Sequence, residues 1–131
     1  MLNLVILILR LCLAVVFIGH GLQVAFGLFG GPDISGFSKM LAGLGFKAPA
    51  VWAYIAVYTQ LIAGLFLILG FLTRFAAFSL FIFMLVAVIT VHISKGFFIQ
   101  SGGFEYNFVL MCICASLMLT GSGKFGMTPK L

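Results

Sequence analysis

The side chains that could do chemistry in this sequence are two histidines, His20 and His92, the single glutamate Glu105, and a few tyrosines and glutamines. Imidazole, carboxyl and phenol groups donate, accept and exchange protons, as a polar binding site requires. The candidate binding residues are His20, Gln23, Tyr54, Tyr58, Gln60, His92, Glu105 and Tyr106.

The rest of the chain is strongly apolar. Of its 131 residues, 64% are apolar and 7% are charged, against roughly 25% charged residues in an ordinary soluble domain. A fold this small leaves much of its surface exposed, so it could not hide this apolar area in water. A soluble globular enzyme is therefore excluded. The net charge of +5 comes from scattered basic residues, and no nucleic-acid partner is expected because they form no continuous patch.

Four apolar segments are long enough to cross a hydrocarbon core of about 30 Å as helices. They cover residues 2–29, 51–70, 75–93 and 104–119. Helices satisfy their own backbone hydrogen bonds in lipid, and the alternating pattern of a barrel strand is absent. The first segment contains Arg10 and shows no small-residue cleavage site, so we interpret it as a retained span and not as a signal peptide.

A shorter amphipathic segment at residues 34–46 separates the first two spans. Phe37, Met40, Leu41 and Leu44 recur there at helical spacing, which is typical of a helix lying flat at the membrane interface. The sequence therefore predicts an all-α integral membrane protein with a single domain over residues 1–131. The predicted fold is a four-transmembrane-helix bundle with a short interfacial helix between spans 1 and 2.

Four spans place both termini on the same side of the lipid bilayer. The bases on that side are Arg74, Lys124 and Lys130, and those on the other side are Lys39, Lys47 and Lys95, partly offset by Asp33. The positive-inside rule then favours cytoplasmic N- and C-termini. With this orientation, four helices bring polar side chains into the outer half of the bilayer. Such groups are costly in lipid and indicate a functional site.

Helical spacing places several of these residues on shared faces. The predicted faces are His20, Gln23 and Gly27 in the first span, Ala53, Ala56, Gln60, Ala63 and Gly64 in the second, and Glu105, Phe108, Cys112 and Ser116 in the fourth. The face of the second span consists mainly of small residues, which let helices approach closely.

Some of the candidates also have a structural interpretation. Tyr54, Tyr58 and Trp52 fit an aromatic belt at the membrane interface. Gln60 fits an interhelical hydrogen bond.

Arg10 and Arg74 are interpreted as structural charges, Arg10 as a base that snorkels or caps a helix. The three cysteines lie in apolar stretches without a Cys-x-x-Cys motif, so no disulfide framework is expected. Haem ligation by His20 and His92 is disfavoured because the two side chains should lie at different depths, and no metal or haem is expected.

The motifs along the chain resemble those of a known family. They are Arg10 and His20-Gly21, then Gly64, Leu69-Gly70 and Thr73-Arg74, then His92 and Lys95-Gly96-Phe97-Phe98, and finally Gly102-Gly103-Phe104-Glu105-Tyr106. Over about residues 4–123 this pattern is similar to the DoxX family of small four-helix bacterial membrane proteins.

The resemblance implies a bacterial inner-membrane protein with a redox role. Relatives include the membrane subunit of a thiosulfate:quinone oxidoreductase, a subunit of a mycobacterial membrane complex that joins thiol handling to superoxide detoxification, and proteins of quinone-stress operons. This sequence departs from the family's pattern at two places. Gln60 stands where the family often has Glu, which removes a proton-carrying group from the midplane. The tail Met127-Thr128-Pro129-Lys130 replaces the family's Ser/Asp-type ending, so the family's tail contact is in question.

The first functional hypothesis is a redox subunit that interacts with a quinone or quinol, its electrons coming from a partner protein or a bound reductant. His20 and His92 would bind the head group, Glu105 would exchange protons at its rim, and Tyr54 or Tyr58 would line the pocket.

Two further hypotheses fit the same sequence. A non-catalytic scaffold or anchor subunit would dock a partner protein through the segment Phe37–Leu44 and the loop carrying Phe97-Phe98. A small-solute carrier would need homo-oligomers, because four short spans are few for one transport path. Whether the chain is an enzyme stays open between these hypotheses.

Overall fold

The structure is a computed structural model that describes residues 1–129. The described chain is all-α, as predicted. Its helices are α1 (Leu2–Phe26), α2 (Asp33–Gly43), α3 (Pro49–Leu69), α4 (Thr73–Ala87) and α5 (Glu105–Thr120). Three segments are long and apolar enough to cross a membrane, namely Leu2–Phe26, Pro49–Leu69 and Thr73–Lys95. The fourth, α5, is apolar but shorter, at 16 residues.

The helix boundaries differ from the predicted ones where the backbone leaves the right-handed region. The first span was expected to reach Phe29, but α1 ends at Phe26 because Gly27 adopts a left-handed conformation with φ 67°. A single 3₁₀ turn, Leu28–Gly30, follows. Helix α2 covers a shorter stretch than the predicted segment 34–46 and buries only Leu41.

The end of the third span is not a regular α-helix. After Ala87 the chain widens into a π-helical turn, Val88–His92, in which the N–H of Ile93 donates to the carbonyl of Val88. A 3₁₀ turn, Ile93–Lys95, completes the segment. A π turn changes the direction in which later side chains point, so it decides where His92 faces.

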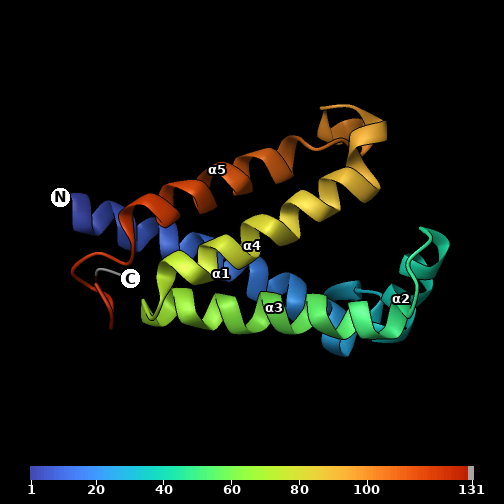
Figure 1. The fold of residues 1–131 in the computed structure, drawn as a ribbon, viewed down its shortest axis with the longest axis horizontal. Helices are drawn as coiled ribbons and strands as arrows, with labels where there is room; N and C mark the ends of the chain where they lie inside the picture. Colours follow the sequence, from blue (N-terminus) through green and yellow to red (C-terminus); the bar gives the residue numbers. More distant parts are fainter. Residues whose placement is uncertain (130–131) are drawn as a thin grey trace.

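The spanning helices associate as two pairs, α1 with α3 and α4 with α5. Figure 1 shows these pairs lying close at the end that holds the N-terminus and diverging toward the end that holds α2. The small-residue face of α3 packs as predicted: a Cβ added to Gly64 would lie 2.6 Å from Cγ1 of Ile18 on α1. Glycine at this position therefore sets the close approach of the two helices.

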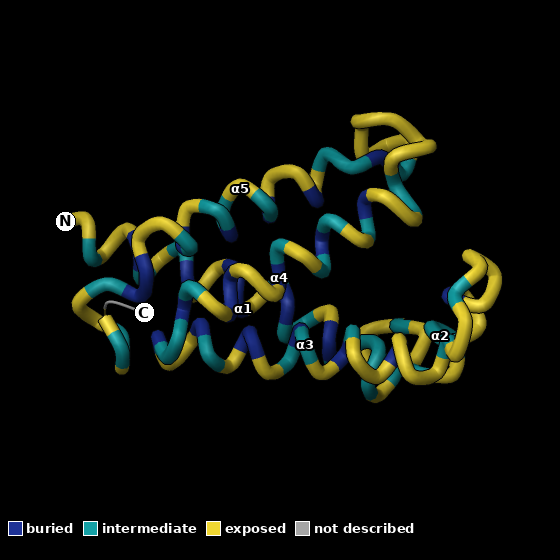
Figure 2. Tube along the Cα trace, viewed as in Figure 1, coloured by how far each residue is buried: buried dark blue, intermediate teal, exposed yellow. Residues whose placement is uncertain are grey.

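The core lies between the pairs, and the outward faces of the helices are apolar and exposed (Figure 2). The stripe predicted on the fourth span does not face the core, because Phe108, Cys112 and Ser116 lie on the outside. The buried face of α5 is instead Asn107, Leu110, Cys114 and Leu117.

Arg10 lies inside this core with 1% of its surface exposed. Its guanidinium donates to the carbonyls of Leu67 and Ile68, each at 2.9 Å, and of Ser122, at 3.1 Å. The first two belong to the last turn of α3, whose carbonyls lack partners within the helix. Arg10 thus caps α3 and binds the tail that follows α5.

The tail runs across the α3–α4 turn. Thr128 accepts a hydrogen bond from the N–H of Leu72 at 2.8 Å through Oγ1, and its own N–H donates to Gly70 O at 3.1 Å. Arg74 donates to the carbonyls of Met118 and Leu119 at the end of α5. The tail is therefore held in place despite its departure from the family's ending, while Lys130 lies outside the described residues.

Candidate functional site

A cavity of about 330 Å³ lies at the end of the bundle where the helix pairs diverge. All five helices contribute to its walls. Its polar lining residues are His20 from α1, Gln60 from α3, His92 from the π turn, and Tyr106 and Asn107 from α5. Its apolar lining comes from Val24, Phe37, Phe83, Met84, Ala87 and Ile99. The cavity therefore combines a few hydrogen-bonding groups with mostly apolar walls, as small-molecule sites do.

His92 is fixed by a backbone contact. Its Nδ1 lies 2.7 Å from the carbonyl oxygen of Gly102, in the loop before α5. Because a carbonyl can only accept, Nδ1 must carry the proton in this bond. The neutral ring then presents Nε2 as an acceptor, the usual way in which a protein sets a histidine tautomer.

His20 and Tyr106 meet across the cavity from α1 and α5. Nε2 of His20 lies 3.3 Å from the hydroxyl of Tyr106, and the two rings are 6.2 Å apart at their centroids. Both side chains are partly exposed. One group donates and the other accepts, so the pair can offer a ligand either a donor or an acceptor.

Two amide side chains form the deeper part of the lining. Gln60 and Asn107 are each only 4% exposed. The amide nitrogen of Gln60 donates to the carbonyl of Ala56 at 3.4 Å, and that of Asn107 donates to the sulfur of Met84 at 3.3 Å. Asn107 is not among the residues predicted from sequence. The signal was its spacing to Leu110, Cys114 and Leu117 on one helical face.

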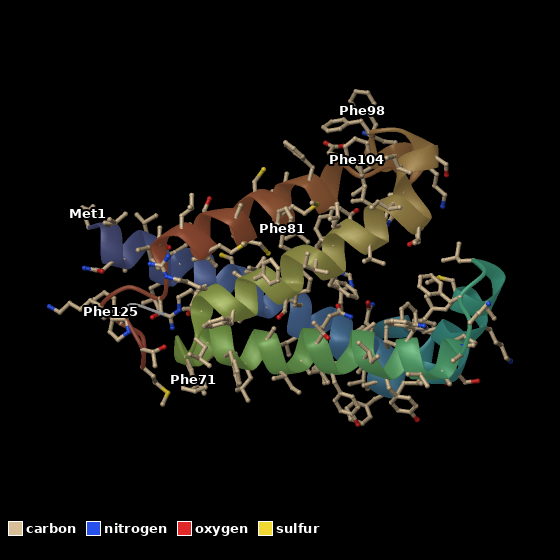
Figure 3. The ribbon with its side chains drawn as sticks, in the orientation of Figure 1. Met1, Phe71, Phe81, Phe98, Phe104 and Phe125 are labelled. Carbon is tan, nitrogen blue, oxygen red and sulfur yellow. The ribbon has the colours of Figure 1, made fainter. Side chains whose placement is uncertain are left out.

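Two predicted residues lie near this end but do not line the cavity. Gln23 donates to the carbonyl of Phe29 at 3.4 Å. Glu105 accepts a hydrogen bond from the N–H of Ile99 at 3.0 Å through Oε2, which ties the loop to the first turn of α5. Figure 3 shows that loop, marked by Phe98 and Phe104, at the opposite end of the bundle from Met1 and Phe125.

Tyr54 and Tyr58 lie elsewhere. Their rings stack at 6.3 Å on the outside of α3 and line a separate groove of about 470 Å³ between α3 and α4. Gln60 follows Tyr58 by two positions, which corresponds to about 200° around a helix. The tyrosines therefore do not share the site.

Metal-binding and thiol groups were also sought in the described chain. Within residues 1–129 there is no group of three or more His, Cys, Asp or Glu side chains that could hold a metal ion. Cys12 and Cys112 are exposed, Cys114 is buried, and all three are free thiols.

The chain matches the DoxX family over residues 5–93, which is more than half of its length. It belongs to the DoxX family. The matched region includes His20, Gln60 and His92 but ends before α5. Tyr106 and Asn107 are thus contributions to the cavity from beyond the DoxX match.

Comparison with individual proteins assigns no activity to this DoxX chain. An uncharacterized protein of Haemophilus influenzae is 31% identical over 74 residues, which are 56% of this chain and 49% of that protein. The chain thus spans about half the length of the curated relative it matches. No solved structure matches it.

Proposed function

We propose that this DoxX protein is a redox-associated membrane subunit that binds the head group of a quinone or quinol in the cavity. One observation carries the proposal: side chains of four apolar helices bring His20, Gln60, His92, Tyr106 and Asn107 to one cavity of about 330 Å³. That volume lies at the lower end of the range for small-molecule sites, about 300–1,000 Å³. Polar groups inside a membrane bundle cost free energy, so their presence together in one place indicates a functional site.

The residues have distinct roles in this proposal. Nε2 of His92 accepts a hydrogen bond or a proton from one oxygen of the head group, while the Gly102 carbonyl holds the ring. The His20–Tyr106 pair binds the second oxygen. Phe83 and Phe37 provide apolar surface for the ring and its tail.

Oxidation of a quinol breaks two O–H bonds and releases two protons and two electrons; reduction of a quinone is the reverse. The imidazoles of His92 and His20 exchange the protons as general bases or acids. The electrons pass to or from a redox partner protein, to which this chain supplies the quinone site.

The test is direct binding of a short-chain quinone to the protein in lipid nanodiscs. His92→Ala and Tyr106→Phe are expected to weaken binding about tenfold each, because a hydrogen bond to a bound ligand is worth about 1 kcal/mol or more. Tyr58→Phe, a matched loss of one phenol in the other groove, should leave the affinity unchanged. Affinity is measured by competition between ligands and not by quenching of tryptophan fluorescence. The ring of Trp52 lies 6.4 Å from that of Phe46, centroid to centroid, and does not line the cavity.

Equal affinities in the wild type and in the double variant His20→Ala/His92→Ala would contradict the proposal. That result would favour a scaffold role, in which the polar residues only hold the bundle together.

A further inference from the structure

A second hollow runs along the outer side of α3 and α4. It is the groove of about 470 Å³ that Tyr54 and Tyr58 line, here named the α3–α4 groove. Its lining includes two small buried residues, Ala63 and Ala76, and no charged side chain. From Tyr54 to Phe66 the lining extends over 12 positions of α3, about 18 Å at 1.5 Å per residue. The groove therefore suits a long apolar chain better than a polar head group.

The groove and the cavity lie on shared faces of α3 and α4. On α4, Ser79 lines the groove, and Phe83 and Ala87, four and eight positions later, line the cavity. On α3, Gln60 lines the cavity and Ala63, three positions later, lines the groove. Residues at these spacings are neighbours on one side of a helix. The two hollows therefore follow one another along the α3–α4 boundary.

An apolar tail attached to a head group in the cavity cannot continue down into the bundle. Below the cavity the ring of Phe83 meets that of Phe17 edge-on, with the centroids 6.2 Å apart. Phe17 lies three residues before His20 on α1, about 4.5 Å deeper. Phe17 and Leu80 have no exposed surface, and a close-packed core has no room for a further chain. The tail must leave the cavity sideways or through its mouth.

Three of the four boundaries between neighbouring spans are bridged at the cavity. His20 of α1 lies 3.3 Å from the hydroxyl of Tyr106 on α5. Asn107 of α5 donates at 3.3 Å to a methionine sulfur on α4. Helices α1 and α3 approach so closely that a Cβ added to Gly21 would lie 2.7 Å from Cδ2 of Leu61. These contacts close the α1–α5, α4–α5 and α1–α3 boundaries to a bulky chain.

The fourth boundary, between α3 and α4, lacks such a bridge. Within the described chain, no hydrogen bond or ring contact joins residues 49–63 of α3 to residues 76–87 of α4, and the two helices diverge there (Figure 1). The mouth of the cavity leads instead past Phe37 of α2 and Ile99 of the loop. A tail that left through the mouth toward water would lose about 0.8 kcal/mol per exposed CH₂. The α3–α4 boundary is thus the favourable exit.

From this geometry we propose that the α3–α4 groove binds the isoprenoid tail of the ligand whose head group lies in the cavity. The inference rests on the proposed function and adds the ligand class, a quinone or quinol with a long prenyl tail. A short-chain ligand ends before the groove. Tyr58→Phe therefore stays a valid control in the head-group assay above.

The experiment compares two quinones with the same head group in nanodiscs, one with a single isoprene unit and one with several. Affinities are expressed as mole fractions in the lipid, because a longer tail by itself increases partition into the bilayer. Lipid is as apolar as the groove, so the gain comes from packing, and the long-chain quinone is expected to bind about threefold to tenfold more tightly.

Ser79→Phe tests the groove directly. The serine is exposed and its hydroxyl donates only to the carbonyl of Phe75 on its own helix, so the fold should tolerate the change. The new ring fills the groove and should abolish the preference for the long chain while leaving short-chain affinity unchanged. Val15→Phe adds the same ring at a position of α1 that is 71% exposed and does not line the groove, and it should preserve the preference.

A second filling variant covers the case in which Ser79→Phe disturbs α4. Thr59 lines the groove from α3 and is half-buried. Thr59→Phe should likewise remove the preference for the long chain without weakening binding of the short-chain quinone.

The outcomes separate the two proposals. If both quinones bind equally to the wild type, or if the preference survives both filling variants, the tail site is overturned, and bilayer lipid or a second copy of the chain covers the groove. The quinone site still stands in that case if His92→Ala weakens binding of the short-chain ligand. If neither quinone binds, both proposals fall.

Discussion

At the scale of single residues, the chain uses its few polar groups in two separate places. Arg10 and Arg74 hold helix ends and the tail at one end of the bundle. His20, His92 and the two buried amides gather at the other end. The first set donates to backbone carbonyls that hold the fold together, whereas the second lines a cavity, so only the second is a candidate site.

Arg10→Lys tests the structural set. A guanidinium serves three carbonyls in fixed directions, and an ammonium cannot reproduce that fork. Because hydrogen bonds from charged groups contribute about 1.5–3 kcal/mol each, the variant should lose roughly 2 kcal/mol or more of stability. The measurement is the midpoint of thermal unfolding in detergent, with Cys12→Ala on the neighbouring exposed position as the control. A midpoint equal to that of the control would contradict the assigned role.

At this scale the sequence predicts which polar residues lie toward one end of the bundle better than it predicts the direction in which they point. His20, Gln60 and His92 line one cavity. Tyr54 and Tyr58 line a separate groove on another face of α3. Asn107 was missed because the predicted stripe of the fourth span followed Glu105 and Phe108, one helical face away. The rotation of a helix about its axis depends on the neighbour against which it packs. The sequence of an almost uniformly apolar helix has no distinct polar face, so it does not indicate that rotation.

At the scale of elements, the π turn Val88–His92 and the loop before α5 close one side of the cavity, to which they supply His92, Ile99, Gly102 and Gly103. Apolar length suffices to predict the helices themselves. A π turn carries no hydrophobic signal, so it could not be predicted in the same way. Thr90 lies within the turn and donates to the carbonyl of Val86 at 2.7 Å.

Thr90→Val tests whether that turn positions His92. The variant keeps the side-chain shape and removes the hydroxyl beside the widened turn, so the segment should relax toward a regular α-helix and rotate the imidazole away from Gly102. Ligand affinity is expected to fall between threefold and tenfold. Ser79→Ala is the matched control, since Ser79 makes the same bond to Phe75, four residues back, in the regular part of α4. Equal losses in both variants would show that the turn has no special role.

Glu105 anchors the loop to α5 and does not line the cavity, and this role can be tested apart from ligand binding. Glu105→Ala removes the acceptor of the Ile99 N–H, worth about 1 kcal/mol. Hydrogen exchange of the backbone at residues 97–103 should become about fivefold faster. Glu105→Gln retains an acceptor and should leave quinone affinity within twofold. A large loss of affinity in Glu105→Gln would instead make this carboxyl the proton exchanger that the sequence suggested.

At the scale of the whole molecule, two helix pairs are fastened at one end and diverge at the other (Figure 1). Helix α5 is about 24 Å long at 1.5 Å per residue, which is less than a hydrocarbon core of about 30 Å. The loop that carries Phe97, Phe98 and Phe104 packs ring against ring beside it. This aromatic loop leads directly into the N-terminal end of α5.

The side of the membrane to which the cavity end belongs is a prediction of the charge pattern. Single cysteines placed at Lys95 and at Lys124, in a chain whose own three cysteines are replaced, should differ in labelling. A membrane-impermeant maleimide added to intact cells is expected to label position 95 and to reach position 124 only after permeabilisation. The reverse pattern would place the cavity end in the cytoplasm.

The arginine on α1 also has a consequence for biogenesis. Its acceptors at Leu67 and Ile68 lie 57 and 58 residues further along the chain, and its acceptor at Ser122 lies 112 residues further. During synthesis a ribosome delivers this cation to the insertion machinery long before any of these carbonyls exist. Until those segments are made, the guanidinium of the first helix lacks its native partners, and its solvation by water or by the insertion machinery costs less than burial in lipid.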